Sequence, residues 1–343
     1  MKRRVTLKDV AAQAGVTYQT VSKVINGRAR VLPATEARVW SATRELGYRP
    51  NHSARSLRAQ RSLMIGYSWV PTRPDQTNHI LDMFLTSMVE EAEAAGYHLL
   101  PFPYREDSDQ VSAYGELIDA ARVDGFVISS VNYDDPRVAY LQERQVPFVA
   151  FGRIAASQHS AYVDVDGAAG LRLATTHLLE LGHRRIAVLA WPPGSRVGDE
   201  RIGGYFDALT AAGLGPDPAW VARGPGTFEF GLAATNEWLA GSAPARPTAI
   251  VALNDIQAVG AMHAALGLGR TPGQQISIIG FDDSPMDQYL WPPLTSVAQP
   301  IRAAGRKCVE MLVGLLRAQA PPETQVLLAP ELVVRGSTGP CPS

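Results

Sequence analysis

Short apolar runs alternate with amphipathic stretches from Leu63 almost to the end of the chain, and this alternation constrains the fold most. Apolar runs of about four to eight residues separated by helical stretches are typical of parallel sheets in α/β domains. The candidate strands are 63–67, 97–101, 125–129 and 147–151, then 185–190, 220–223, 249–253 and 276–281, with helices expected over 82–95, 167–181, 199–212 and 255–266. Two such series predict two similar doubly wound subdomains. Ligands are therefore expected at strand carboxyl ends, in the cleft between the subdomains.

Residues 1–62, the head, differ in charge from residues 63–343, the body. The head holds 13 Lys or Arg against 3 Asp or Glu, and the body 19 against 30, so the overall net charge of −1 combines +10 with −11. A compact basic segment can neutralise nucleic-acid phosphates. A solvated charge run would give the same count, so charge alone leaves both readings open.

The head has the pattern of a helix-turn-helix followed by a third helix. Thr6 and Asp9 have the spacing of a capping box, which starts the first helix. Gly15 supplies a tight turn, and Thr17 caps a second helix over about 18–25. A third helix is expected over about 34–46. The buried faces are expected to hold Val10, Ala11, Ala14, Val21, Val24, Ile25, Val39, Ala42 and Leu46.

The second helix is left with an exposed face of Gln, Lys, Tyr and hydroxyl side chains, which can meet base edges and phosphates in a major groove. A helix-turn-helix that serves only protein contacts is the alternative. After the third helix, Pro50 interrupts the chain and Asn51 can cap a further helix over 53–58. So short a helix is expected to be marginal in isolation.

These segments closely resemble the head of the lac repressor family: VTLKDVA (5–11), AGVTYQTVS (14–22), VIN (24–26) and GYRPN (47–51). The resemblance implies that the second helix reads the major groove of operator DNA. It also implies that the short hinge helix inserts a leucine wedge, Leu57, into the minor groove at a dimer axis. The implied base-contacting residues are Tyr18, Gln19, Lys23 and Leu57, and the implied phosphate-contacting residues are Thr6, Thr20, Ser22, Asn26, Arg30, Tyr48 and Asn51.

Two residues depart from the family pattern. Lys23 stands where the family's namesake has an arginine, and an ammonium cannot make the same bidentate contact with guanine, so the resemblance leaves the operator sequence open. Leu32 takes the place of the Ser or Thr cap before the third helix, which predicts a weaker helix start. Leu57 could also serve as an ordinary core residue.

The body carries further motifs that match the family: GR (152–153), VDVD (163–166), LGHRRI (181–186), RIGG (201–204), ND (254–255), GFDD (280–283) and PLT (293–295). The resemblance implies a body like that of periplasmic sugar-binding proteins, with chain crossings near residues 163, 292 and 325. It implies that the effector is reached by Asp166, Arg201, Asn254 and Asp282. Carboxylates, a guanidinium and an amide can satisfy the donors and acceptors of a polyhydroxyl ligand.

Aromatic residues near the strand ends could stack on the apolar face of a sugar, although each could equally belong to the core. They are Trp69, Phe151, Tyr205 and Phe228. Asn78 and His79 lie near the first cleft loop. His183 follows a Leu-Gly turn, which favours a structural role at a helix-to-strand joint.

The expected organisation is a helix-turn-helix domain over 1–50, a hinge helix and linker over 51–62, an effector domain over 63–337 and a tail over 338–343. One subdomain is expected to combine about 63–163 with 293–324, and the other about 164–292 with 325–337. Cys308 and Cys341 are the two cysteines, so neither a disulfide framework nor a metal cluster is expected, and no cofactor. No segment has signal or membrane length, which favours the cytoplasm and no membrane partner.

Together these features predict a repressor that acts as a homodimer on a pseudo-palindromic operator and responds to a small molecule in the cleft. A sugar is the favoured effector, and a purine or another metabolite is the alternative. The chain stops soon after Ser337, so the tetramer-forming extension of some relatives is not expected. An enzyme is disfavoured because the usual catalytic motifs are missing, and a transport-type binding protein because a head replaces the export signal.

Overall fold

The computed structural model divides the chain into two compact units, the head over residues 1–62 and the body over residues 63–343. It describes residues 5–25, 31–48, 61–71, 78–103, 110–154, 160–241, 246–319 and 323–342.

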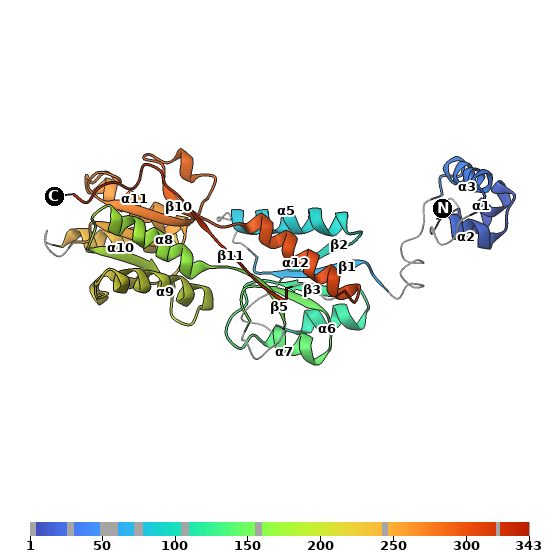
Figure 1. The fold of residues 1–343 in the computed structure, drawn as a ribbon, viewed down its shortest axis with the longest axis horizontal. Coiled ribbons are helices and arrows are strands. Elements are labelled where there is room, and N and C mark those ends of the chain that lie inside the picture. The colour runs from blue at the N-terminus through green and yellow to red at the C-terminus, as the bar shows by residue number, and fades with distance from the viewer. Residues whose placement is uncertain are drawn as a thin grey trace. The chain divides into compact units, whose positions relative to one another are not determined.

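The described residues of the head contain three of the helices predicted for it (Figure 1): α1 (Leu7–Ala14), α2 (Tyr18–Ile25) and α3 (Pro33–Glu45). The capping box is confirmed, because the Asp9 carboxylate accepts from the Thr6 backbone N–H at 2.8 Å and the Asp9 N–H donates to the Thr6 hydroxyl at 3.4 Å. Gly15 ends α1 with φ of 61°, a left-handed value that suits glycine. At the start of α3, Leu32 makes no side-chain cap and Pro33 occupies the first turn, as predicted.

The helices of the head pack around one small core. Its buried members are Val10, Ala11, Ala14, Val21, Val24, Val39 and Ala42. Ile25 and Leu46, which were predicted to be buried, are half-buried at the edge of this core, and Thr43 is buried in addition. The buried faces of the sequence pattern are therefore confirmed except at two edge positions.

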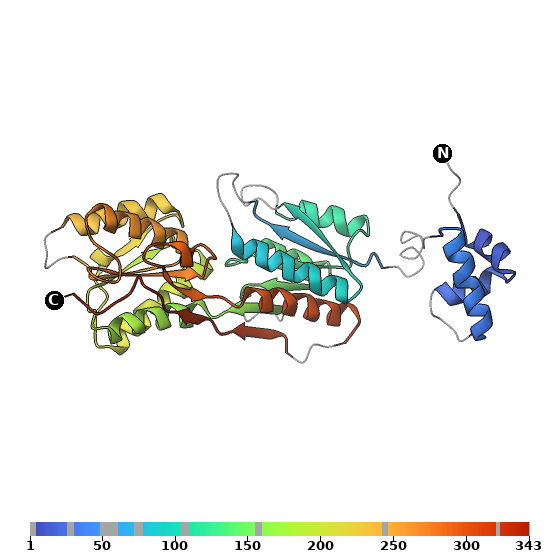
Figure 2. The same ribbon diagram turned by 90° about the horizontal axis from the view of Figure 1, so that it is seen from above.

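The body consists of two α/β lobes, each with a six-stranded sheet covered by helices on both faces (Figures 1 and 2). The first lobe has the strand order β11-β5-β4-β3-β1-β2, all parallel. Helices α5 and α12 pack on one face of its sheet, and α6 and α7 pack on the other. Its elements are β1 (Met64–Trp69), α5 (His79–Ala94), β2 (His98–Pro103), α6 (Ser112–Asp119), β3 (Gly125–Ile128), α7 (Pro136–Glu143), β4 (Phe148–Phe151), β5 (Ala161–Val165), α12 (Ile301–Leu316) and β11 (Gln325–Leu328).

The second lobe repeats this plan with the order β12-β10-β9-β8-β6-β7, in which only β12 runs antiparallel to its neighbour. Helices α8 and α9 cover one face of the sheet, and α10 and α11 cover the other. Its elements are α8 (Gly167–Glu180), β6 (Ile186–Ala190), α9 (Arg196–Ala211), the short η2 (Pro218–Trp220), β7 (Val221–Arg223), α10 (Phe228–Ala240), β8 (Ala249–Ala252), α11 (Asp255–Gly267), β9 (Ser277–Asp282), the short η4 (Asp287–Tyr289), β10 (Thr295–Ala298) and β12 (Glu331–Val333).

The chain passes between the lobes at positions slightly later than predicted. The passages lie between β5 and α8, between β10 and α12, and between β11 and β12, rather than near 163, 292 and 325. Residues 295–298, assigned above to the first subdomain, pair with β9 in the second. Residues 325–328, assigned to the second, pair with β5 in the first. An apolar run identifies a strand, but the neighbour with which it pairs is decided by the tertiary fold.

None of the helices in the described ranges is both long and apolar enough to cross a bilayer. The same residues contain no group of three or more His, Cys, Asp or Glu side chains placed to hold a metal ion. Cys308 is buried and Cys341 half-buried, and both are free thiols.

Candidate functional site

The polar face of α2 is the candidate surface of the head. Val21 and Val24 are buried against α1 and α3, so the opposite side of the helix faces outward. Gln19 and Lys23 are exposed on that side. The neighbouring predicted contacts Tyr18, Thr20 and Ser22 are half-buried. The local helix therefore presents Gln19 and Lys23 as the freely accessible donors.

Other predicted DNA contacts of the head also contribute to local structure. Thr6 is exposed and caps α1, and the Thr20 hydroxyl lies 2.9 Å from that of Thr17 at the start of α2. Tyr48 is half-buried against the core just after α3. The remaining predicted contacts, Asn26, Arg30, Asn51 and Leu57, and the predicted hinge helix over 53–58, lie outside the described residues.

The candidate site of the body is a cavity of about 360 Å³ between its two lobes. This volume falls in the range of about 300–1,000 Å³ that small-molecule pockets occupy. The strands of both lobes end at the cavity, as the doubly wound pattern predicted. Its lining comprises Tyr67, Trp69, Val70, Asn78, Ile80, Leu81, Phe84, Ser129, Ser130, Val131, Asn132, Phe151, Gly152, Asp164, Val165, Gly167, Trp191, Ser195, Arg196, Val197, Glu200, Arg201, Gln299 and Ile301.

Aromatic rings form the wall that the first lobe contributes to this cavity. Trp69 ends β1, Phe151 ends β4, and Phe84 lies on α5. The rings of Phe84 and Phe151 are stacked with centroids 4.5 Å apart. Trp69 and Phe151, both predicted from their places at strand ends, therefore line the cavity.

Arg201 is the charged residue placed deepest in the cavity wall. It lies on α9 and is only 6% exposed. Its Nη1 donates to the Leu253 carbonyl at 2.5 Å and lies 3.8 Å from Asp282 Oδ1, while its guanidinium sits 3.8 Å from the centre of the Phe281 ring. Burial lowers the pKa of Arg201 from its usual value, and the Asp282 carboxylate opposes that shift. The two residues predicted to share the effector, Arg201 and Asp282, are thus adjacent.

Asp282 lies at the end of β9, behind the cavity wall. Its Oδ1 accepts from Gln299 Nε2 at 2.6 Å, and Gln299 itself lines the cavity. Burial raises the pKa of Asp282 to about 7, and the Arg201 guanidinium acts in the opposite direction. Asp282 also has a φ of 125°, a value rare for residues other than glycine. Asp282 is therefore a buried carboxyl group beside the cavity that holds its proton more tightly than an exposed aspartate does.

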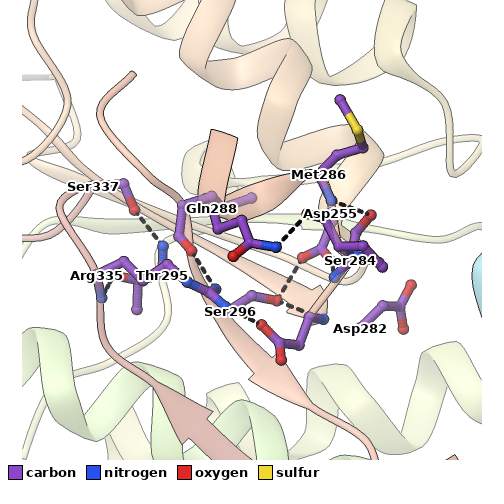
Figure 3. A network of polar contacts seen from close by, with 12 residues as sticks. Asp255, Asp282, Ser284, Met286, Gln288, Thr295, Ser296, Arg335 and Ser337 are labelled. Atoms are coloured by element: carbon purple, nitrogen blue, oxygen red, sulfur yellow. Dashed lines mark hydrogen bonds and ion pairs between the residues drawn. The ribbon is translucent and has the colours of Figure 1, made fainter. Parts of the chain in front are cut away.

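A polar network holds the segment that follows Asp282 (Figure 3). Asp255 accepts from the Ser296 hydroxyl at 2.5 Å and from the Ser284 backbone N–H at 2.8 Å. Farther along, Arg335 Nη2 donates to Asp283 at 2.6 Å. The network joins the start of α11, the loop after β9 and the strand β10. It therefore anchors the backbone on which Asp282 is placed.

An ion pair and a hydrogen bond join the two lobes beside the cavity. Arg153, which follows β4, lies 3.1 Å from Asp164 of its own lobe and 3.3 Å from Glu200 of the second lobe. Glu200 also pairs with Arg196 at 3.2 Å. The Arg196 backbone N–H donates to Asn132 Oδ1 at 3.0 Å, again across the lobes. These contacts hold the cavity closed on one side.

Two family models match the chain. The model for bacterial regulatory proteins of the lacI family covers residues 6–51, and that for a periplasmic binding protein-like domain covers residues 175–338. The transcriptional regulator CelR of Thermobifida fusca is 34% identical over 98% of this chain and 99% of its own length. The chain belongs to the LacI family. It is a DNA-binding transcriptional regulator with a helix-turn-helix head and a periplasmic-binding-protein-like body.

Solved structures of LacI-family members are similar to this chain, two of them over nearly its full length. A lac repressor dimer bound to operator and the anti-inducer ONPF is 30% identical, with a TM-score of 0.84 over 98% of this chain and 99% of that one. A regulatory protein of the family from Chloroflexus aggregans is 53% identical, with a TM-score of 0.78 over 81% of this chain and 99% of that one. A complex of CelR with cellobiose is 33% identical, with a TM-score of 0.74 over 97% and 100%.

Several residues predicted for the effector site do not line the cavity of this LacI-family member. Asp166 caps α8 by accepting from the Ala169 N–H at 2.9 Å. Asn254 caps α11, and its Nδ2 donates to the Gly226 carbonyl at 3.1 Å. Phe228 packs edge-on against His263 at 5.1 Å. Asp166 and Asn254 therefore serve as helix caps, and Phe228 packs against a neighbouring helix.

Tyr205 belongs to the core rather than to the cavity. It is fully buried, and its hydroxyl donates to the Ile186 carbonyl at 2.7 Å. The structural role predicted for His183 is confirmed, since its buried ring lies within hydrogen-bond distance of Thr248, Ser277 and the Gly339 carbonyl. Asn78 caps α5 and lines the cavity, and the His79 ring lies 3.4 Å from the Asp282 carbonyl across the lobes.

Sequence reasoning missed many polar and aromatic residues of the cavity, among them Asp164, Trp191, Arg196, Glu200 and Gln299. Trp191 carried a usable signal, because it follows a predicted strand directly, as Trp69 does. The other four had no local signal, since their role depends on the approach of the opposite lobe.

Proposed function

We propose that this regulator is a repressor whose affinity for operator DNA is set by a sugar bound between the lobes of its body. The observation that carries this proposal is the cavity itself. It combines aromatic ring faces from Trp69 and Phe151 with the buried guanidinium of Arg201. Such a mixture of apolar faces and fixed polar groups suits a polyhydroxyl ring.

The proposed DNA complex contains two copies of the chain. Twofold symmetry of a homodimer matches a pseudo-palindromic operator, with one head on each half-site. The lac repressor dimer on its operator is the relative that supports this arrangement. The proposed base-contacting residues are Tyr18, Gln19, Lys23 and Leu57, and the proposed phosphate-contacting residues are Thr6, Thr20, Ser22, Asn26, Arg30, Tyr48 and Asn51.

The proposed effector contacts centre on Arg201 and Asp282. A guanidinium donates to ring and hydroxyl oxygens, and a carboxylate accepts from hydroxyls. Trp69 and Phe151 would cover the apolar face of the sugar. Asp166 and Asn254 would contribute indirectly, by capping the starts of α8 and α11. Phe228 would contribute through its packing against His263. The structure of CelR with cellobiose supports a saccharide ligand.

Effector binding is proposed to act on the head by moving the lobes. A ligand that contacts both lobes favours one degree of closure and so shifts the balance between two arrangements of the body. Coupling energies of this kind are about 1–3 kcal/mol and are reciprocal, so operator DNA changes effector affinity by the same factor.

The proposal places the protein in the cytoplasm, where its DNA target lies, and gives it a binding role rather than a catalytic one. A purine or another small metabolite is the alternative effector, because Arg201 and the aromatic wall could also hold a planar base. Binding of a labelled operator, followed by fluorescence anisotropy with and without sugars or purines, tests the proposal. No preference for any palindrome over random DNA would overturn it.

A further inference from the structure

The two lobes present a tryptophan from matching places in their sheets. Trp69 ends β1, and Trp191 directly follows β6. Each of these strands lies second from the β2 or β7 edge of its sheet, and both tryptophans line the cavity. The two-lobed fold therefore brings one indole from each lobe to the same site.

Trp191 is held in place by charged and backbone neighbours. The guanidinium of Arg201 lies over its ring at 5.1 Å from the centroid, a cation–π distance. A Cβ at Gly226 would stand 2.7 Å from Asn254 Nδ2 and 2.9 Å from Trp191 Nε1, so the glycine leaves room for both side chains. The indole is thus a fixed surface of the second lobe.

Two buried N–H groups, one on this indole ring and one on the neighbouring Arg201, lack hydrogen-bond partners in the part of the chain that the structure describes. They are Trp191 Nε1 and Arg201 Nε. Buried donors normally find an acceptor, and an unpaired one costs about 1–3 kcal/mol. Both residues line the cavity, so hydroxyl or ring oxygens of a bound molecule can supply the acceptors.

The arginines around the cavity are already matched by carboxylates. Arg153 and Arg196 both face Glu200, at 3.3 and 3.2 Å, and Arg201 faces Asp282 at 3.8 Å. An anionic ligand would have to compete with these carboxylates for each cation and would be repelled by them. An uncharged ligand meets no such penalty.

We propose that the effector is an uncharged saccharide whose ring faces are held by Trp69 of the first lobe and Trp191 of the second, so that Trp191 decides specificity. This inference rests on the proposed function and narrows its ligand class to neutral sugars. Because the indoles come from different lobes, a saccharide that contacts both rings links them, and its binding favours closure.

The test uses the full-length chain and a panel of neutral mono- and disaccharides, including cellobiose, with the matching sugar acids, sugar phosphates and free purine bases. Isothermal titration measures affinity, and operator anisotropy is recorded in parallel. Neutral saccharides are expected to bind at least tenfold more tightly than their anionic forms. Equal or tighter binding of the anionic forms, or binding of purine bases alone, would overturn the inference.

Trp191→Leu and Trp69→Leu are expected to weaken binding of the best saccharide roughly tenfold each, near the upper range of one aromatic contact. Trp191→Phe, which keeps a ring face, should lose less than Trp191→Leu. Trp291→Phe is the matched control, because Trp291 is 87% exposed and lies outside the cavity.

Each variant is checked by its melting temperature, and its binding to operator DNA without saccharide shows whether the head is still functional. Saccharide affinity unaltered in Trp191→Leu would refute the role of Trp191 while leaving the sugar-responsive regulator in place. Failure of every neutral saccharide to bind would refute both the inference and the sugar effector. If the unsubstituted chain showed no preference for operator over random DNA, the proposed role as a regulator would itself be refuted.

Discussion

Arg153 of the first lobe reaches across the cleft to Glu200 of the second, with Nη2 3.3 Å from Oε2. Both side chains are about three-quarters buried, at 27% and 23% exposed, so the pair is only partly screened by solvent. Arg153 lies in the loop after β4 of the first lobe, and Glu200 lies on α9 of the second lobe. The pair therefore stabilises one particular degree of lobe closure.

Glu200→Gln is expected to reduce effector affinity about two- to fivefold. Partly exposed ion pairs contribute roughly 0.2–1 kcal/mol. In the native protein this energy favours the closed arrangement of the lobes, and Glu200→Gln removes it. A double-mutant cycle with Arg153→Met, read by titration calorimetry, isolates the pair from other effects of each substitution. Asp207→Asn, in the exposed pair with Arg172, is the control. Strict additivity of the two cleft substitutions would show that the pair has no role in closure.

Arg201→Met is expected to abolish the effector response while operator binding persists. It should also lower stability, because it removes the hydrogen bond to the Leu253 carbonyl, the contact with the Phe281 ring and the positive charge beside the Asp282 carboxyl group. Adding Asp282→Asn should restore part of the melting temperature but none of the effector binding. A normal effector response in Arg201→Met would place the ligand site elsewhere.

Gln19→Ala is expected to relax operator preference at one base pair in each half-site. Loss of a base-edge contact by an exposed helix side chain costs about 1–3 kcal/mol at that position. Operator selection followed by anisotropy measures the change. Glu36→Gln, an exposed change on α3, should leave base preference unaltered. If Gln19→Ala weakens all sequences equally, the residue contacts phosphate rather than a base.

Stability of the body is expected to fall as pH rises from about 4 to 9. Burial, and next the Asp255 carboxylate, raise the pKa of Asp287 to about 9. A carboxyl group whose pKa is raised on folding contributes most below its unfolded pKa of about 4, and that contribution is lost as pH rises towards the folded pKa. The raised pKa values of Asp255 and Asp282 act in the same direction.

Asp287→Asn should flatten this pH dependence and raise the melting temperature at pH 8, by about 2–4 °C for each kcal/mol gained. Melting curves at pH 6 and pH 8 give the comparison. Asp207→Asn, an exposed acid on α9, should leave the slope as it was. An Asp287→Asn protein with an unchanged slope would assign the pH dependence to other groups.

Local signals in the sequence were sufficient for most elements and for part of the site. Trp69 and Phe151 were predicted from strand ends, and Arg201 from a family motif, and all three line the cavity. The capping roles of Asp166 and Asn254 were not anticipated, although both stand directly before predicted helices. A residue at that position can serve the helix or a ligand, and the sequence pattern does not distinguish the two.

The sequence by itself determined where helices begin and end in the head and which residues alternate between core and surface. These features depend on groups a few residues apart, as between Thr6 and Asp9. Only the tertiary structure decided that β10 and β11 pair with the opposite sheets from those expected, and that Arg153 meets Glu200. Such contacts join residues tens to hundreds of positions apart, whose approach is decided by how whole sheets pack.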